Sequence, residues 1–308
     1  MSVIDVAKTD PTAGKAIKAP ASPWSMALRR FTRNKLALIG FIILVIMFVV
    51  CFFGPLFSPY ELEDYKISMK NKPPSAEHWL GTDNLGRDIL LRVMLAGRIS
   101  LLVGLISTTI SVIVGATMGS IAGFYGRVAD TVIMRITDIF MAMPTLPILI
   151  ILGAVLSDLK VDPKYRIFFL MLIIGILGWT TMARLVRGQI LSLREMEYMQ
   201  AVDALGIRDR RKIFRHLLPN TVPIIIVAAT LSVAGAILYE SVLSYLGIGV
   251  VPPTPSWGNM ISAANNMIDF RKRPWLWIPP GMCILITVVA INLIGDGLRD
   301  ALDPKTKK

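Results

Sequence analysis

Residues 36–57 read LALIGFIILVIMFVVCFFGPLF and contain no charged side chain. A helix needs about 20 mainly apolar residues to cross the hydrocarbon core of a bilayer. Five further charge-free runs of comparable length follow along the chain, at 99–124, 139–157, 167–183, 221–239 and 274–295. A water-soluble core does not need six such runs. The sequence therefore predicts an all-α polytopic membrane protein with six transmembrane helices.

The composition of the 308-residue chain agrees with a membrane protein and excludes other classes. Apolar residues make up 54% and charged residues 18%, and the mean hydropathy is +0.61; intrinsically disordered chains are poor in apolar residues. The two cysteines, Cys51 and Cys283, both lie in apolar runs, which excludes a disulfide scaffold. A net charge of +12 in such an apolar chain indicates basic loops on one side of a membrane, with the lipid bilayer and not nucleic acid as the partner.

The distribution of Lys and Arg indicates the orientation of the chain. With the N-terminus inside, the inner segments hold 21 basic residues and the outer segments 12. Because basic loops are retained on the cytoplasmic side, both termini are predicted to be cytoplasmic. The predicted organisation is a basic tail at 1–35 (disordered over 1–22), a first transmembrane helix at 36–57 without cleavage, an extracytoplasmic loop at 58–98, a five-helix core at 99–297 and a cytoplasmic C-terminus at 298–308.

The cytoplasmic loop at 194–220 is too long to be a simple connection. Apolar residues recur in it at a spacing of three, which predicts a short amphipathic helix: Met196, Met199, Val202 and Leu205. Gly206 is expected to end this helix, and Pro219 to close a second one whose apolar face includes Ile213 and Phe214. Such a hairpin fits either docking into a groove of a partner protein or lying on the lipid surface, and the pattern alone leaves both open.

The same loop resembles the cytoplasmic signature of binding-protein-dependent ABC importer permeases. That signature is Glu-Ala-Ala, three residues, Gly, nine residues and Ile-x-Leu-Pro. Aligned on Gly206, this sequence matches at Ala201, Leu218 and Pro219 and departs at Gln200, Val202 and His216. Segments 78–92, 240–257 and 292–304 resemble the oligopeptide/dipeptide C-type permease subunit of the peptide/nickel subfamily. Together the resemblance covers about residues 24–307.

The resemblance implies a type I ABC importer permease in the bacterial cytoplasmic (inner) membrane that forms half of a translocation pore for peptides. It implies three kinds of protein partner besides the lipid bilayer: a second homologous permease, two cytoplasmic ABC ATPases and an extracytoplasmic peptide-binding protein. It also implies that 194–220 is the element that couples to an ATPase. The residues expected to make that contact are Glu197, Gln200, Ala201, Asp203, Gly206, Arg208, Phe214, Leu218 and Pro219.

The chain is predicted to have no catalytic, metal or cofactor site of its own. It lacks a Gly-x4-Gly-Lys-Ser/Thr phosphate loop, and its two histidines, His78 and His216, are too far apart in sequence to indicate a metal cluster. The alternative within the family is a nickel permease. A stand-alone secondary transporter or an intramembrane enzyme would need ionisable groups inside the spans, which are almost free of charge.

Four residues on the extracytoplasmic side are predicted to form the outer gate or to contact the binding protein: Asp83, Arg87, Glu240 and Trp257. The alternative is a bracing role, in which Thr82 and Asp83 cap the helix that follows and Glu240 steadies the turn at 247–249. Trp257 is expected at the membrane interface, where indole is favoured. Arg135 and Asp138 are expected to form an ion pair within one helix; the alternative is that they take part in gating.

Overall fold

The computed structural model describes residues 23–302, so the tail predicted at 1–22 lies outside the described residues. Within 23–302 the only β pairing is an isolated bridge between Thr82 and Asp88, which confirms the all-α class. The short elements are α1 (Pro23–Arg33), η1 (Gly54–Phe57), η2 (Ile67–Met69), α7 (Glu197–Ala204), α8 (Asp209–Arg211), η3 (Lys212–Leu217), α10 (Trp257–Ile261), η4 (Ser262–Asn265), α11 (Met267–Lys272) and η5 (Pro274–Leu276).

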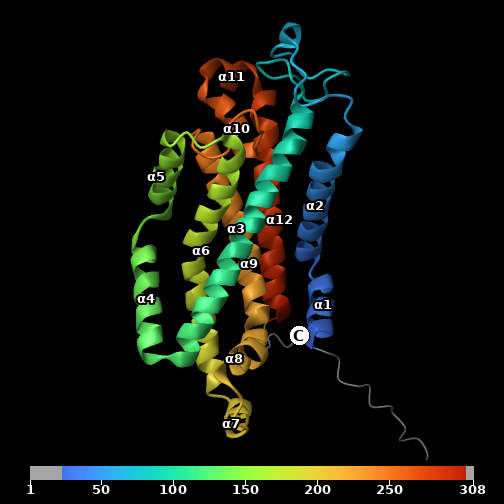
Figure 1. Cartoon of the computed structure of the whole chain (residues 1–308). Coiled ribbons are helices and arrows are strands. Elements are labelled where there is room, and N and C mark those ends of the chain that lie inside the picture. The colour runs from blue at the N-terminus through green and yellow to red at the C-terminus, as the bar shows by residue number, and fades with distance from the viewer. Residues whose placement is uncertain (1–22, 303–308) are drawn as a thin grey trace, which may run out of the picture.

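The long helices form an elongated bundle (Figure 1). They are α2 (Lys35–Phe53), α3 (Ile89–Tyr125), α4 (Arg127–Ala142), α5 (Thr145–Asp158), α6 (Pro163–Arg194), α9 (Leu218–Tyr245) and α12 (Ile278–Leu302). Five continuous segments of the described chain are long and apolar enough to cross a membrane, and α4 with α5 makes a sixth only as a bent pair. The six-span prediction is therefore confirmed, with one span broken.

The third span is not the continuous run predicted at 139–157. It bends by 83° between α4 and α5. Pro144 causes the break, because a residue before proline is driven out of the α region, and Met143 accordingly has an extended ψ of 131°. Pro144 then stands at the N-cap of α5.

Two helix boundaries also differ from the predicted ones. α3 begins at Ile89, within the predicted loop 58–98, because the Asp88 carboxylate accepts a hydrogen bond from the backbone N–H of Leu91 at 2.8 Å. Pro219 does not close the second helix of the loop. A π-helical turn, η3, leads directly into α9, which contains both Pro219 and Pro223. Local π adjustments of this kind accommodate proline in membrane helices.

α3 lies at the centre of the bundle and packs most closely against α6 (Figure 1). Gly115, Gly119 and Gly123 recur every four residues on the face that meets α6. A Cβ atom at any of them would lie less than 3.0 Å from atoms of α6. Small residues at this spacing let two helix backbones approach, which is how helices associate in lipid.

Candidate functional site

Two polar regions lie at opposite ends of the bundle, and both contain residues singled out in the sequence. The first, which we call the knob, comprises residues 195–217 with α7, α8 and η3, and its α7 projects below the bundle (Figure 1). The second, which we call the brace, comprises residues 78–92 together with 240–257. The structure thus separates the predicted coupling residues from the predicted gate residues by the length of the bundle.

Only part of the apolar surface of α7 is covered by the bundle. Met199 and Val202 are buried in a cluster with Val186 and Ile190 of α6 and Ile225 of α9. On the adjacent arc of the helix, Tyr198, Ala201 and Leu205 are exposed, and Leu205 is 77% accessible. α7 therefore holds one apolar arc against the bundle and presents the other to its surroundings.

Leu205 was missing from the predicted contact residues, and the reason is geometric. A step of three residues turns a helix by about 300°, so a stripe with this spacing drifts by about 60° at each step. Over nine residues of an ideal helix the drift is half a turn, so positions 196 and 205 of the stripe fall on opposite sides. The exposed arc is indicated by apolar residues at positions 198, 201 and 205, which are separated by three and then four residues.

Gly206 reverses the chain after α7 with φ +64°, in the left-handed region that glycine adopts at little cost. The knob is then tied together by Lys212, whose ammonium lies 2.6 Å from the Asp203 carboxylate and 3.5 Å from that of Asp209. Arg194 also donates to the Phe124 carbonyl oxygen at the end of α3, at 2.9 Å. The Lys212 contacts join α7 and α8 to η3, and the Arg194 contact fastens the end of α6 to the end of α3 beside the knob.

The other predicted coupling residues divide by exposure. Five of them have exposed side chains: Glu197, Gln200, Arg208, Phe214 and Pro219. Asp203 is exposed but engaged with Lys212, and Leu218 is half-buried.

Asp138 of α4, predicted to pair with Arg135 on the same helix, pairs instead with a residue of α6. Asp138 accepts from Arg184 of α6 at 2.7 Å, and Asp130 accepts two hydrogen bonds from Arg187 of α6. The predicted Arg135–Asp138 pair is therefore wrong. The two cross-helix pairs fasten α4 to α6 near the knob.

The brace buries a compact set of charges. The Asp83 carboxylate accepts from the Arg87 guanidinium at 2.7 Å and lies 3.4 Å from Nε of Arg92, and all three side chains are buried. His78 Nδ1 lies 2.9 Å from the Asp88 carboxylate. The alternative prediction that Thr82 and Asp83 cap α3 is wrong, because Asp88 caps this helix. The hydroxyl of Thr82 instead accepts from the Lys72 N–H at 2.9 Å.

Glu240 joins three elements of the brace. Its carboxylate accepts from the Ser100 hydroxyl of α3 at 2.8 Å and from the Ser244 hydroxyl of α9 at 2.7 Å. The Ser244 oxygen in turn accepts from the backbone N–H of Val250 at 2.9 Å, within the turn that follows α9. The Glu240 side chain is fully buried, so it acts as a polar junction between α3, α9 and this turn.

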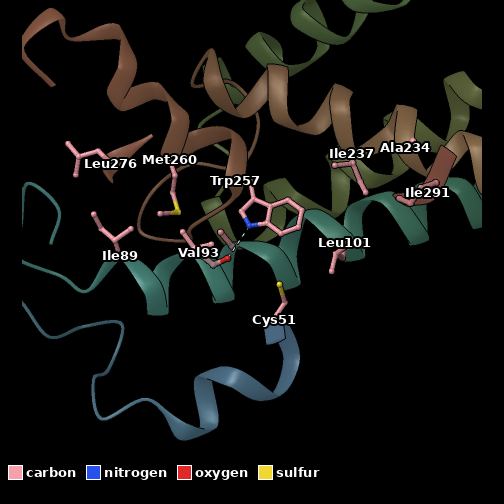
Figure 2. Packing of buried hydrophobic residues seen from close by; sticks show 11 residues of the cluster. Cys51, Ile89, Val93, Leu101, Ala234, Ile237, Trp257, Met260, Leu276 and Ile291 are labelled. Carbon is pink, nitrogen blue, oxygen red and sulfur yellow. Dashed lines mark hydrogen bonds between the residues drawn. The ribbon is translucent and has the colours of Figure 1, made fainter. Parts of the chain in front are cut away.

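Trp257 is not at a lipid interface. It inserts from α10 into the bundle and is fully buried (Figure 2). Its indole N–H donates to the Val93 carbonyl oxygen of α3 at 3.0 Å, so the polar group that would favour an interface is satisfied inside the protein. All four predicted gate residues, Asp83, Arg87, Glu240 and Trp257, are buried. None offers an exposed side chain for the predicted contact with a binding protein.

Among residues 23–302 no group of three or more His, Cys, Asp or Glu side chains is placed to hold a metal ion. The exposed apolar arc of α7 and the buried ion pairs of the brace favour mechanical roles: presentation of an apolar surface at the knob, and fastening of helices at the brace.

Comparison with known proteins identifies two family matches. Residues 115–308 match "Binding-protein-dependent transport system inner membrane component", and residues 22–74 match "N-terminal TM domain of oligopeptide transport permease C".

Individual relatives agree with these matches over nearly their whole length. The chain is 42% identical over 296 residues to the "Oligopeptide transport system permease protein OppC" of Bacillus subtilis, covering 96% of this chain and 94% of that protein. It is 41% identical over 286 residues to the "Dipeptide transport system permease protein DppC" of Alkalihalophilus pseudofirmus, covering 93% and 91%.

Proposed function

The chain belongs to the family of binding-protein-dependent transport system inner membrane components, and from this premise we propose that it is the permease subunit of an ATP-driven importer of oligopeptides or dipeptides. It is a multi-pass protein of the bacterial inner membrane. The relatives quoted above carry oligopeptide or dipeptide names, which favours peptides over the nickel alternative. Membership of this family also favours a subunit of a larger transport complex over the stand-alone secondary transporter.

In the proposed complex a second, homologous permease supplies the other half of the pore. Two cytoplasmic ATPases bind and hydrolyse ATP, while an extracytoplasmic binding protein delivers the peptide. The knob end is then the cytoplasmic end, with both termini on the same side. The present chain contributes the path through the membrane and no chemistry.

The observation that carries this proposal is the exposed apolar arc of α7. Leu205 is 77% accessible at the tip of a helix that is otherwise pinned to the bundle. An amphipathic helix that presents an apolar face among charges is suited to a groove in a partner protein. The residues proposed to line this contact are Glu197, Gln200, Ala201, Leu205, Arg208 and Phe214.

The buried arc of α7 gives the contact its mechanical consequence. Met199 and Val202 pack against α6 and α9, and Lys212 ties α7 to the start of the α9 segment. A displacement of the knob by an ATPase would therefore move both of these helices. We propose that this is how ATP-driven closure of the ATPases switches the pore between its two orientations.

At the other end, the brace is proposed to act as the outer gate through its rigidity. The Glu240 junction and the Trp257 insertion make α3, α9 and α10 one unit. Such a unit moves as a block when the bundle rocks, and its exposed neighbours, rather than Asp83, Arg87, Glu240 or Trp257, would meet the binding protein.

The test is reconstitution of the complete complex in proteoliposomes, with ATP on the knob side and the binding protein with labelled alanine peptides of different lengths on the other. We expect ATP-dependent peptide uptake that requires the binding protein. Hydrolysis of ATP that ignores every binding protein and peptide supplied would contradict the peptide assignment.

Gly206 provides the matched pair of variants for the knob. A Cβ atom at Gly206 would meet no atom within 4 Å, so Gly206→Val acts only through the left-handed backbone, which costs a β-branched residue about 1–2 kcal/mol. Gly206→Asn is the control, since asparagine tolerates this conformation. We expect Gly206→Val to keep the subunit in the membrane and to separate ATP hydrolysis from uptake. Uptake at the normal rate in this variant would refute the coupling role.

A further inference from the structure

A cavity of about 290 Å³ lies within the bundle, between α3, the α4–α5 break, α6 and α9. Ser107, on its wall, is the middle residue of α3, eighteen residues from either end of that helix, which places the cavity halfway along the longest helix of the bundle. Met143 and Thr145, on either side of Pro144, also line it. Irregular backbone within a membrane span is tolerated where it is buried in protein or lines a cavity, so the broken span and the cavity belong together.

The polar groups of this cavity are hydroxyls, and none of its lining residues carries a formal charge. The Ser107 hydroxyl donates to the Met171 carbonyl oxygen at 3.0 Å, and that of Ser111 donates to the Gly175 carbonyl oxygen at 2.7 Å. The Ser232 hydroxyl donates to the Ala228 carbonyl oxygen at 2.8 Å. With its proton engaged in this way, each hydroxyl oxygen still has lone pairs that accept hydrogen bonds.

Thr108 adds an unused hydroxyl to the same wall. Its side chain is 5% exposed, and its hydroxyl oxygen has no hydrogen-bond partner. Buried hydroxyls in proteins are almost always partnered. A threonine on a helix has more than one accessible rotamer because its hydroxyl can bond to the backbone of the preceding turn, so rotation can turn this group toward a guest.

The remaining walls are apolar and adaptable. Met141 and Met143 contribute flexible thioether side chains, and Phe140 and Tyr239 contribute aromatic rings. Methionine adapts its shape to irregular neighbours. Gly235 leaves the cavity open at α9, since a Cβ atom there would meet nothing within 4 Å.

We propose that this cavity is a station on the translocation path that holds a short segment of the peptide main chain. Uncharged acceptor oxygens match the backbone N–H groups that every peptide carries, and the methionine and aromatic walls accept side chains of different shape. Without fixed charges the cavity does not select for the charge of those side chains. The inference rests on the proposed function, because the guest is the peptide of that transport reaction.

Two variants test the cavity in the reconstituted complex. Gly235→Leu narrows it, and we expect uptake to fall at least tenfold while the complex assembles normally. Its control is Gly188→Leu on α6, where a Cβ atom also meets nothing within 4 Å and which does not line the cavity. Thr108→Val removes the unpartnered hydroxyl without changing the side-chain shape, and we expect uptake to fall about threefold, the worth of one uncharged hydrogen bond.

The control for Thr108→Val is Thr109→Val, one residue along α3, whose exposed hydroxyl donates to the Leu105 carbonyl oxygen. A merely structural role of Thr108 predicts an unchanged or higher thermal unfolding midpoint and unchanged uptake, because an unpartnered buried hydroxyl destabilises the fold. The proposal predicts the same midpoint behaviour with reduced uptake.

A second readout isolates the hydrogen bond. Uptake of the transported peptide is compared with that of its analogue with one N-methylated amide, in wild type and in Thr108→Val. The binding protein is the same in both, so its own preference cancels in the ratio. We expect the preference for the unmethylated peptide to shrink about threefold in the variant. Peptide uptake by the wild-type complex tests the proposed function by itself. Unchanged uptake in both Gly235→Leu and Thr108→Val, with an unchanged preference for the unmethylated peptide, would overturn the proposed role of the cavity.

Discussion

The knob and the brace are both rich in charged and small polar residues, yet they use them in opposite ways. In the brace, Asp83, Arg87 and Arg92 are buried against one another. In the knob, Lys212 is the charge that fastens, while Leu205 stands 77% exposed. A region that braces turns its polar groups inward and satisfies them, whereas a region that engages a partner keeps an apolar arc uncovered.

This difference shows why a polar motif alone does not identify a contact surface. Both regions contain segments that resemble the permease family, and the sequence predicts a contact with a partner protein at each of them. Burial distinguishes the two regions. The polar groups of the brace are satisfied within the chain, whereas part of the apolar face of α7 in the knob stays exposed. Substitutions at the brace should therefore affect stability first, and substitutions at the knob should affect coupling first.

The largest effect is expected at the brace from Trp257→Ala. The side chain is fully buried and its indole N–H is hydrogen-bonded to Val93, so its removal should cost about 3–5 kcal/mol of folding free energy. Thermal unfolding of the purified complex measures this as a lowered midpoint. Trp79→Ala, at a residue of the same region whose side chain is 72% exposed, should leave the midpoint in place, because only the buried residues of the brace fasten helices; equal midpoints for the two variants would contradict this role.

A somewhat smaller loss of stability is expected from Asp83→Asn. It leaves Arg87 and Arg92 buried without a counter-charge, which should cost about 3 kcal/mol. The control is Asp64→Asn in an exposed turn, where the carboxylate accepts only from the nearby Glu61 N–H at 2.9 Å. The same unfolding measurement applies. A normal midpoint for Asp83→Asn would show that the buried charges are solvated by other groups.

At the knob, Leu205→Asp should leave the unfolding midpoint unchanged and lower ATP-dependent uptake at least tenfold, a coupling loss of about 1.4 kcal/mol. A charge on the apolar arc of α7 would have to be desolvated in the ATPase groove. Leu205→Met keeps the arc apolar and serves as the control. Normal uptake in Leu205→Asp would remove the exposed arc from the contact.

The smallest effect is expected from Lys212→Met. The ammonium contacts Asp203 and Asp209, whose side chains are 60% and 51% exposed, and ion pairs with such exposed partners add little stability. The variant should instead make the knob more compliant, so that about twice as much ATP is hydrolysed per peptide imported. Arg210→Met removes an equal charge from the exposed turn and should leave this ratio unchanged.

Much of the fold could be predicted because span hydrophobicity is a local property of the sequence. The helix ends could not, and Arg98 illustrates the reason. It lies at the edge of a charge-free run, so the sequence predicts that the loop extends to it. In the folded chain Arg98 instead donates to the Cys51 and Phe52 carbonyl oxygens at the end of α2, at 2.9 and 2.5 Å. A charged residue whose side chain is hydrogen-bonded to another helix can lie inside a helix and need not mark its end.

For the candidate site, the glycine reversal at Gly206 could be predicted because a left-handed turn needs a specific residue. The pairing of Asp138 with Arg184 could not, because it joins residues 46 positions apart and competes with a local alternative. The burial of Trp257 was missed for the same reason, since the Val93 carbonyl that satisfies it lies 164 positions away. What a residue type requires can be predicted locally; the partner that it meets cannot.

The most direct test of the account is affinity purification of the tagged chain from native membranes in mild detergent, followed by mass spectrometry, for wild type and Leu205→Asp in parallel. The account predicts that wild type recovers a second homologous permease and the ATPases, and that Leu205→Asp keeps the second permease and loses the ATPases. Recovery of the wild-type chain alone as a homogeneous species, or of the ATPases in equal amount with both proteins, would contradict it.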